Sequence, residues 1–139
     1  MFTVDLPMAP SDNKIYVTLS NGVRKLSKEA SQFQKKVSDI VSTAALRQSG
    51  LHFRQDVAYR IELAVFFTAI ENKSWNPNET TKTKRRFKKV DAQNREKLTI
   101  DSFMGAIGVD DSHIMEKLVT KLCDPDNPRI EVRIMECAF

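Results

Sequence analysis

Apolar and polar residues alternate in several short stretches of this chain, the pattern of strands with one buried face. Residues 2–6 alternate and then stop at two prolines, Pro7 and Pro10. Two further apolar runs, 15–19 and 23–26, flank an Asn-Gly pair, which is a strong signal for a β-hairpin. Residues 57–67 begin with alternation and end in a continuous apolar run, as a central strand does. Two more strands are predicted at 114–122, where the pattern is less clear, and at 130–135.

Two stretches follow the period of an α-helix instead. The first begins after Ser27 and ends near Ser49-Gly50, with an apolar stripe of Phe33, Val37, Ile40, Val41 and Ala44. The second is predicted from Asp91 to Ile107 and is followed by Gly108, a residue that ends helices well. Together these elements predict an α+β fold for residues 1–139: a single domain with a mixed sheet of four to five strands and two helices packed across it.

Composition limits the function classes only broadly. A chain of 139 residues fits one domain, and its 41% hydrophobic and 29% charged content is ordinary for a soluble globular protein. Cys123 and Cys137 have no metal-site spacing, so we expect buried thiols in a reducing compartment. The sequence has no secretory signal pattern and no apolar run of membrane-spanning length. We therefore expect a cytoplasmic protein with no membrane association.

The net charge of +4 is concentrated in one place. The polar, turn-rich loop 72–90 carries six basic residues within eight positions and no acid among them: Lys82, Lys84, Arg85, Arg86, Lys88 and Lys89. Such a run is often only a solvated loop. Because this one leads directly to Asp91, we favour contact with nucleic-acid phosphates. Trp75, in the same loop, is either a base-stacking platform or, as we favour, an aromatic anchor to the core.

A polar stripe follows the basic run. Asp91, Asn94, Lys97 and Asp101 recur at spacings of three, three and four, which lines side chains up along one side of a helix. Asp110 and Asp111 come shortly after. Carboxylate oxygens with a lysine, next to a basic segment, suit a magnesium site that acts on phosphate. A solvated helix face, followed by a turn at Asp111-Ser112, is the ordinary alternative.

These residues, in this order, resemble the RusA family of Holliday-junction resolvases. Residues 4–16, VDLPMAPSDNKIY, are similar to the opening strand and Pro-rich turn of that family. The family's main motif is Asp-x-Asp-Asn, a lysine three residues on, an aspartate four further, and later an Asp-Asp pair. Here it reads Asp91-Ala-Gln93-Asn94, Lys97, Asp101 and Asp110-Asp111. Residues 129–134 resemble the closing strand, so the resemblance spans the chain as one RusA-like endonuclease domain.

The resemblance implies an endodeoxyribonuclease that cleaves phosphodiesters of branched DNA during recombination and repair. Mg²⁺, with Mn²⁺ as a substitute, is the implied cofactor. The catalytic residues would be Asp91, Lys97 and Asp111, and the metal ligands Asp91, Gln93, Asp110 and Asp111. Asn94 and Asp101 would orient them, while we expect His113 to be an exposed residue rather than a base. Paired cuts across a four-way junction imply a homodimer.

One position departs from the family pattern. Gln93 stands where a second aspartate is usual, and an amide ligand supplies no negative charge. Besides an active endonuclease, two alternatives stay open. Because of Gln93, the chain could be a weakened or inactive RusA-like protein that binds branched DNA without cleaving it. Independently of Gln93, it could be a small basic protein with a protein partner, in which the polar stripe is only a solvated face.

Overall fold

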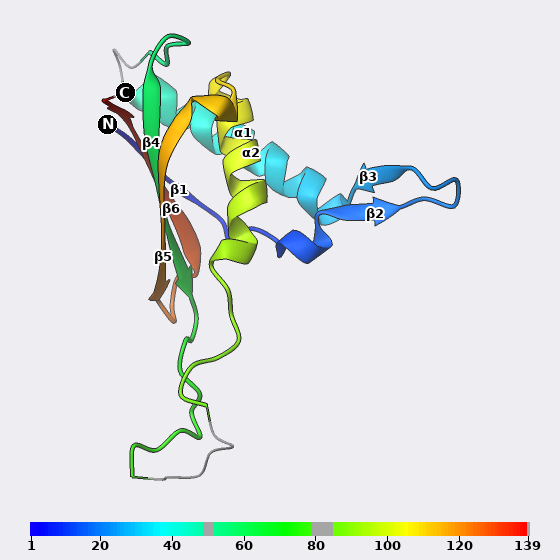
Figure 1. Cartoon of the computed structure of the whole chain (residues 1–139), viewed down its shortest axis with the longest axis vertical. Coiled ribbons are helices and arrows are strands. Elements are labelled where there is room, and N and C mark those ends of the chain that lie inside the picture. The colour runs from blue at the N-terminus through cyan, green and yellow to red at the C-terminus, as the bar shows by residue number, and fades with distance from the viewer. Residues whose placement is uncertain (49–51, 79–84, 139) are drawn as a thin grey trace.

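The computed structural model describes residues 1–48, 52–78 and 85–138, and Figure 1 shows their arrangement. The fold is α+β, as predicted: a mixed sheet of four strands, two helices on one face of it, and a separate two-stranded ribbon. The sheet has the order β1-β6-β4-β5, with β1 Phe2–Leu6, β6 Arg129–Cys137, β4 Ala58–Phe67 and β5 Ile114–Cys123. The ribbon comprises β2 Tyr16–Thr18 and β3 Arg24–Leu26, and the helices are α1 Lys28–Arg47 and α2 Glu96–Ile107.

The direction of the strands explains why α2 lies across the sheet. Strand β6 is antiparallel to both of its neighbours, whereas β5 is parallel to β4. Parallel neighbours need a crossover connection, because the chain must return to the edge from which it started. The connection from β4 to β5 makes that return through α2. Strand β4 is thus central, as its apolar run predicted, and β5 forms one edge of the sheet.

The core lies between the helices and one face of the sheet. In β4, alternate residues such as Ile61, Leu63 and Val65 are buried, so one side of the strand faces the helices. Helix α1 buries Ala30, Phe33, Val37 and Val41, and α2 buries a set that includes Leu98, Phe103 and Met104. None of the helices among the described residues combines the length and apolarity needed to cross a membrane.

The helix boundaries agree with the prediction at two of the four ends. Ser27 caps α1 by accepting the backbone N–H of Ala30 at 3.1 Å. Gly108, in the left-handed conformation (φ 74°), ends α2. The predicted end near 49–50 lies outside the described residues, although α1 is regular to Arg47. The predicted start of the second helix at Asp91 is wrong, because α2 begins at Glu96 after a 3₁₀ turn, η2 (Gln93–Arg95).

The two cysteines also differ from the prediction. Cys123 is exposed and Cys137 is half-buried, so neither is the buried thiol that we expected. Both lie at the last residue of a strand, and Cys123 ends β5, whose residues are mostly exposed. The apolar residues that flank a cysteine in the sequence do not indicate which strand lies at an edge.

Candidate functional site

The predicted acidic residues lie at opposite ends of α2. Asp91 and Gln93 come before its first residue, whereas Asp110 and Asp111 follow its last. A helix of 12 residues is about 18 Å long, and Figure 1 shows the chain entering α2 at one end of the molecule's body and leaving at the other. The structure therefore does not bring Asp91 and Asp111 together within one chain.

At the N-terminal end, the Asp91 carboxylate is exposed and takes part in a local turn. Its Oδ1 accepts the backbone N–H of Gln93 at 2.9 Å. A side chain that bonds the backbone two residues on competes with helix formation, which explains why α2 starts later than predicted. Gln93 is exposed and Asn94 is half-buried, both within η2. Among the described residues, no donor is bonded to the second oxygen of the Asp91 carboxylate.

Lys97 is the second residue of α2 and forms an ion pair within the helix. Its Nζ lies 3.5 Å from Oδ2 of Asp101, an i,i+4 ion pair between two exposed side chains. The negative charge of Asp101 raises the pKa of Lys97, and the nearby Tyr16 and Asp12 add to the shift. Lys97 therefore stays protonated at neutral pH and acts as a fixed positive charge rather than a base. Its neighbours also show that Lys97 faces the foot of the β2–β3 ribbon.

At the C-terminal end, Asp110 and Asp111 have different surroundings. Oδ1 of Asp110 accepts the backbone N–H of Ser112 at 2.9 Å. Hydrogen bonding from the side chain and the backbone of Ser112 lowers the pKa of Asp110. Asp110 thus caps the 3₁₀ turn η3 (Asp111–His113). Asp111 instead lines a cavity of about 310 Å³ with Ile100 and the first residues of β5, among them Glu116 and Lys117.

Strand β5 connects the two ends by running back along α2. Lys117 forms an ion pair with Glu96, and farther along β5 the Nζ of Lys121 donates to the carbonyl oxygen of Val90 at 2.5 Å. The two acidic ends thus border one surface, formed by α2 and β5, without sharing a pocket. His113, which we expected to be exposed, is half-buried, with its Nδ1–H 3.2 Å from the carbonyl oxygen of Val57.

Within the described part of one chain, the candidate donors do not form a metal site. Among residues 1–48, 52–78 and 85–138 there is no group of three or more His, Cys, Asp or Glu side chains that could hold a metal ion. Gln93 is uncharged, and Asp91 is separated from Asp111 by the length of α2. The implied magnesium therefore does not fit the described residues of a single chain.

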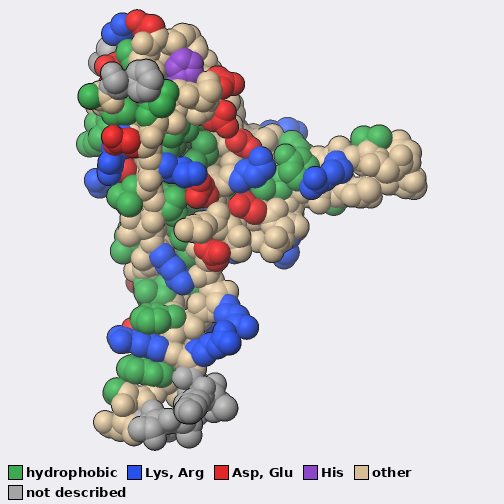
Figure 2. All heavy atoms as spheres, in the orientation of Figure 1, with side chains coloured by type: hydrophobic (Ala, Val, Ile, Leu, Met, Phe, Trp, Pro, Cys, Tyr) green, Lys and Arg blue, Asp and Glu red, His purple; other side chains and the backbone are tan. Residues whose placement is uncertain are grey.

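The basic loop forms an arm that extends beyond the sheet. Its two sides are joined by a short ladder: Asn72 N–H donates to Arg86 O at 2.8 Å, and Lys88 N–H to Ile70 O at 2.9 Å. Figure 2 shows Lys and Arg side chains on this arm and acidic side chains along α2. Lys82 and Lys84 lie outside the described residues. The described basic residues of the loop lead from the arm into the N-terminal end of α2.

An aromatic cluster in the arm corrects our interpretation of Trp75. Among the described residues, Trp75 does not belong to the side chains packed against the core. The guanidinium of Arg86 lies 4.7 Å from the centre of its ring, 5.1 Å from that of Phe87, and 3.3 Å from the carboxylate of Glu71. Arg86 therefore connects Trp75, Phe87 and Glu71 within the arm, and its charge is paired with that of Glu71.

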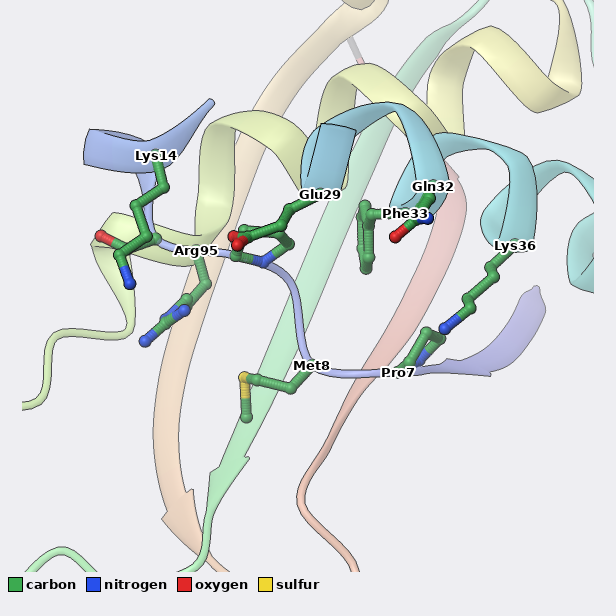
Figure 3. Close-up of a pocket in the computed structure, with 10 residues that line it drawn as sticks. Pro7, Met8, Lys14, Glu29, Gln32, Phe33, Lys36 and Arg95 are labelled. Atoms are coloured by element: carbon green, nitrogen blue, oxygen red, sulfur yellow. The ribbon is translucent and has the colours of Figure 1, made fainter. Parts of the chain in front are cut away.

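A cleft at the foot of the ribbon was not predicted. It has a volume of about 310 Å³ and lies between the Pro-rich turn after β1, the start of α1 and η2. Figure 3 shows Lys14 and Arg95 on one side of it and Lys36 on the other, with Glu29 as its one acidic residue. Only Arg95 falls within the recognised motif, and three separate elements supply the cations, so no pattern along the chain indicates that they meet.

Comparison with known families adds the last observation. A sequence model of the family described as Endodeoxyribonuclease RusA matches residues 5–135. The match includes both acidic ends, Lys97 and the basic loop. No curated protein sequence matches the chain.

Proposed function

This chain belongs to the RusA family of endodeoxyribonucleases, and we propose from that premise that it cuts four-way junctions and related branched DNA by phosphodiester hydrolysis. The family consists of Holliday-junction resolvases, which generally depend on a divalent metal ion. Junction cleavage by this chain, Mg²⁺ as its metal and a homodimeric assembly are parts of the proposal.

One observation carries it: the basic loop ends at the N-terminal end of α2, beside Asp91 and Lys97. Carboxylates repel a polyanion, so a DNA strand lies near them only if cations hold it there. The described cations Arg85, Lys88 and Lys89 stand directly before Asp91 in the chain. Phosphate contacts of this kind are independent of base sequence, as a structure-selective enzyme requires.

The roles of the polar residues follow from their surroundings. Protonated Lys97 is suited to offset the negative charge that develops on the phosphate in the transition state. Asp101 holds the Lys97 ammonium from one turn away, and the half-buried Asn94 lies on the turn that connects Asp91 to α2. We propose both as positioning residues. Asp110 positions Asp111 by capping η3.

The separation of Asp91 from Asp111 bears on the assembly. If both carboxylates serve one metal ion, Asp91 of one chain must meet the partner's Asp111, because α2 keeps the two apart within a chain. A two-fold homodimer would then contain two equal sites, one for each of the paired cuts. Mg²⁺, or Mn²⁺ in its place, would supply Lewis acidity when bound.

The test is incubation of the purified protein with a labelled mobile four-way junction and a linear duplex of matched sequence, with Mg²⁺, Mn²⁺ or EDTA. The proposal expects paired cuts in the junction, only with metal, and none in the duplex. Equal cutting of both substrates would contradict junction selectivity, and cutting in EDTA would contradict the metal requirement.

A second candidate is a protein that binds branched DNA without cleaving it. Two observations favour it: the uncharged Gln93, and the lack of a three-donor metal group in the described part of the chain. This candidate predicts tight, salt-dependent junction binding with no cuts under any metal. It keeps the arm as a phosphate-binding element and gives the acidic residues no catalytic role.

A further inference from the structure

The β2–β3 ribbon projects away from the body of the protein (Figure 1), and its foot is firmly fixed. Ser27 N–H donates to the carbonyl oxygen of Ile15 at 2.7 Å, and Ser27 Oγ donates to that of Lys14 at 2.7 Å. Ile15 is buried in the core, and Ser27 also caps α1. Because these contacts anchor the base of the ribbon, its orientation relative to the rest of the protein is fixed.

The tip of the ribbon is also well defined. Gly22 N–H donates to Leu19 O at 2.9 Å, Leu19 N–H to Val23 O at 2.8 Å, and Val23 N–H to Oδ1 of Asn21 at 3.1 Å. Gly22 has a φ of 80°, which closes the turn in the left-handed region that glycine favours. The turn therefore presents Leu19 and Val23 side by side at the tip.

One face of the ribbon is apolar and exposed. Val17 pairs with Lys25, and the alternation of side chains puts Leu19 and Val23 on the same face as this pair. The exposed fractions are 45% for Val17, 41% for Leu19 and 54% for Val23. A two-stranded ribbon is marginal by itself, so this apolar face suits a surface that meets a partner.

Charge favours a polyanion as that partner. From Asn13 to Lys28 the chain has no acidic residue and carries four cations, Lys14, Arg24, Lys25 and Lys28. The cleft at the foot extends this positive surface with Lys36 and Arg95 (Figure 3). Two copies of so basic a ribbon would repel each other. DNA phosphates, by contrast, would attract both the cations of the ribbon and those of the cleft at its foot.

Building on the proposed function, we propose that the β2–β3 ribbon reads the branch point of the DNA. Leu19 and Val23 contact base faces that open at the exchange point, and Arg24, Lys25 and the cleft at the foot contact the converging phosphates. In a linear duplex the bases are stacked and offer no apolar face. When the arms of a four-way junction separate at the exchange point, the base pairs there lose their stacking partners, and apolar side chains at a rigid tip then contact the opened base faces.

The selectivity for branched DNA is thereby assigned to the ribbon, and sequence-independent affinity to the basic loop. This division of roles is testable because the tip residues are exposed. Leu19→Ser and Val23→Ser together remove the apolar tip without touching the core. Leu46→Ser is the matched control, because Leu46 is an apolar residue of α1 that is 85% exposed.

The experiment measures dissociation constants for a four-way junction and a linear duplex by fluorescence anisotropy at fixed salt. Wild type and Leu46→Ser should prefer the junction, and the double variant should lose about tenfold or more of that preference with unchanged duplex affinity. A 2-aminopurine base at the branch point should brighten with wild type and less with the double variant. Thermal melting of both variants checks that the fold is intact.

Each contrary outcome points to a different failure. If wild type shows no junction preference, the proposed function fails, and this inference with it. If wild type prefers the junction and the double variant prefers it equally, only the ribbon's role is wrong. If wild type is a dimer in solution and the double variant is a monomer, the apolar tip is an interface between copies instead.

Discussion

The two ends of α2 carry the same kind of residue in different settings. Asp91 and Asp110 each accept a backbone N–H two residues on, at 2.9 Å in both cases. At the N-terminal end the carboxylate is joined by Lys97 and the basic loop, with an uncharged Gln93 beside it. At the C-terminal end two acids are adjacent, and Asp111 faces a cavity with Glu116 and Lys117.

This difference indicates which end of α2 attracts DNA and which end supplies adjacent carboxylates. The N-terminal end has the cations that attract DNA, and of its two motif carboxylates Asp101 is paired with Lys97. The C-terminal end has two adjacent carboxylates without a basic arm. Neither end alone has the donors for a metal ion among the described residues. Cleavage would therefore require both ends at one phosphodiester, and substitutions at each end can test that requirement.

The largest effect is expected from Asp91→Asn and Asp111→Asn, one at each end. Each should lower the rate of junction cleavage more than about 100-fold, since a metal ligand contributes more than the residues that orient it. Junction affinity should stay the same or rise, because repulsion falls. Single-turnover cleavage and anisotropy measure the two quantities.

Mixing these two variants tests whether the two ends of α2 act together across two chains. If the ends meet across two chains, a mixed dimer of Asp91→Asn and Asp111→Asn has one intact pair of ends and should recover part of the activity. If both ends serve one site within a chain, mixing should recover nothing. The matched control is Asp91→Asn mixed with itself.

Lys97→Met tests the motif lysine at the N-terminal end. Removal of a group that stabilises transition-state charge should slow cleavage about 100-fold with little change in junction affinity. Lys97→Arg keeps the charge and should retain more activity. Equal activity of Lys97→Met and wild type would mean that its pairing with Asp101 is only a surface ion pair.

Replacing Arg85, Lys88 and Lys89 with alanine tests the arm. Affinity should fall about tenfold for junction and duplex alike, and the slope of log affinity against log salt should become shallower by about 0.9 for each phosphate that is no longer neutralised. The control removes three exposed cations elsewhere, Lys35, Arg47 and Arg133. A weakening confined to junctions would show that the arm reads shape.

Asp110→Ala tests whether Asp110 acts only by holding the η3 turn. Without the bond to Ser112, Asp111 should lose its placement and cleavage should slow about tenfold. Asp110→Asn keeps an oxygen that can accept the same N–H and should restore the rate. No rescue by asparagine would mean that the Asp110 charge itself is needed.

The smallest expected effect is an increase in cleavage activity. Gln93→Asp adds the second carboxylate that the family pattern has at the N-terminal end, and it should raise activity severalfold or lower the metal concentration required. A titration of cleavage rate against Mg²⁺ measures this. An unchanged titration would remove position 93 from the proposed ligands.

Much of the fold could be predicted from local patterns. The alternation in Phe2–Leu6 and the apolar run ending at Phe67 correspond to β1 and β4, and Ser27 and Gly108 bound the helices as expected. These signals are local, because they depend on side-chain period and on backbone preferences of single residues. The start of α2 was misplaced because a side-chain hydrogen bond of Asp91 decided it.

The family, the α+β class and the set of polar residues could be inferred from the chain alone, since they depend on the order and spacing of residues. Which of these residues meet depends on the folded structure. It separated Asp91 from Asp111 by a helix, and it brought Lys14, Lys36 and Arg95 to one cleft from three elements. The physical reason is that contacts between distant segments depend on how helices pack on the sheet, and residue spacing along the chain does not specify that packing.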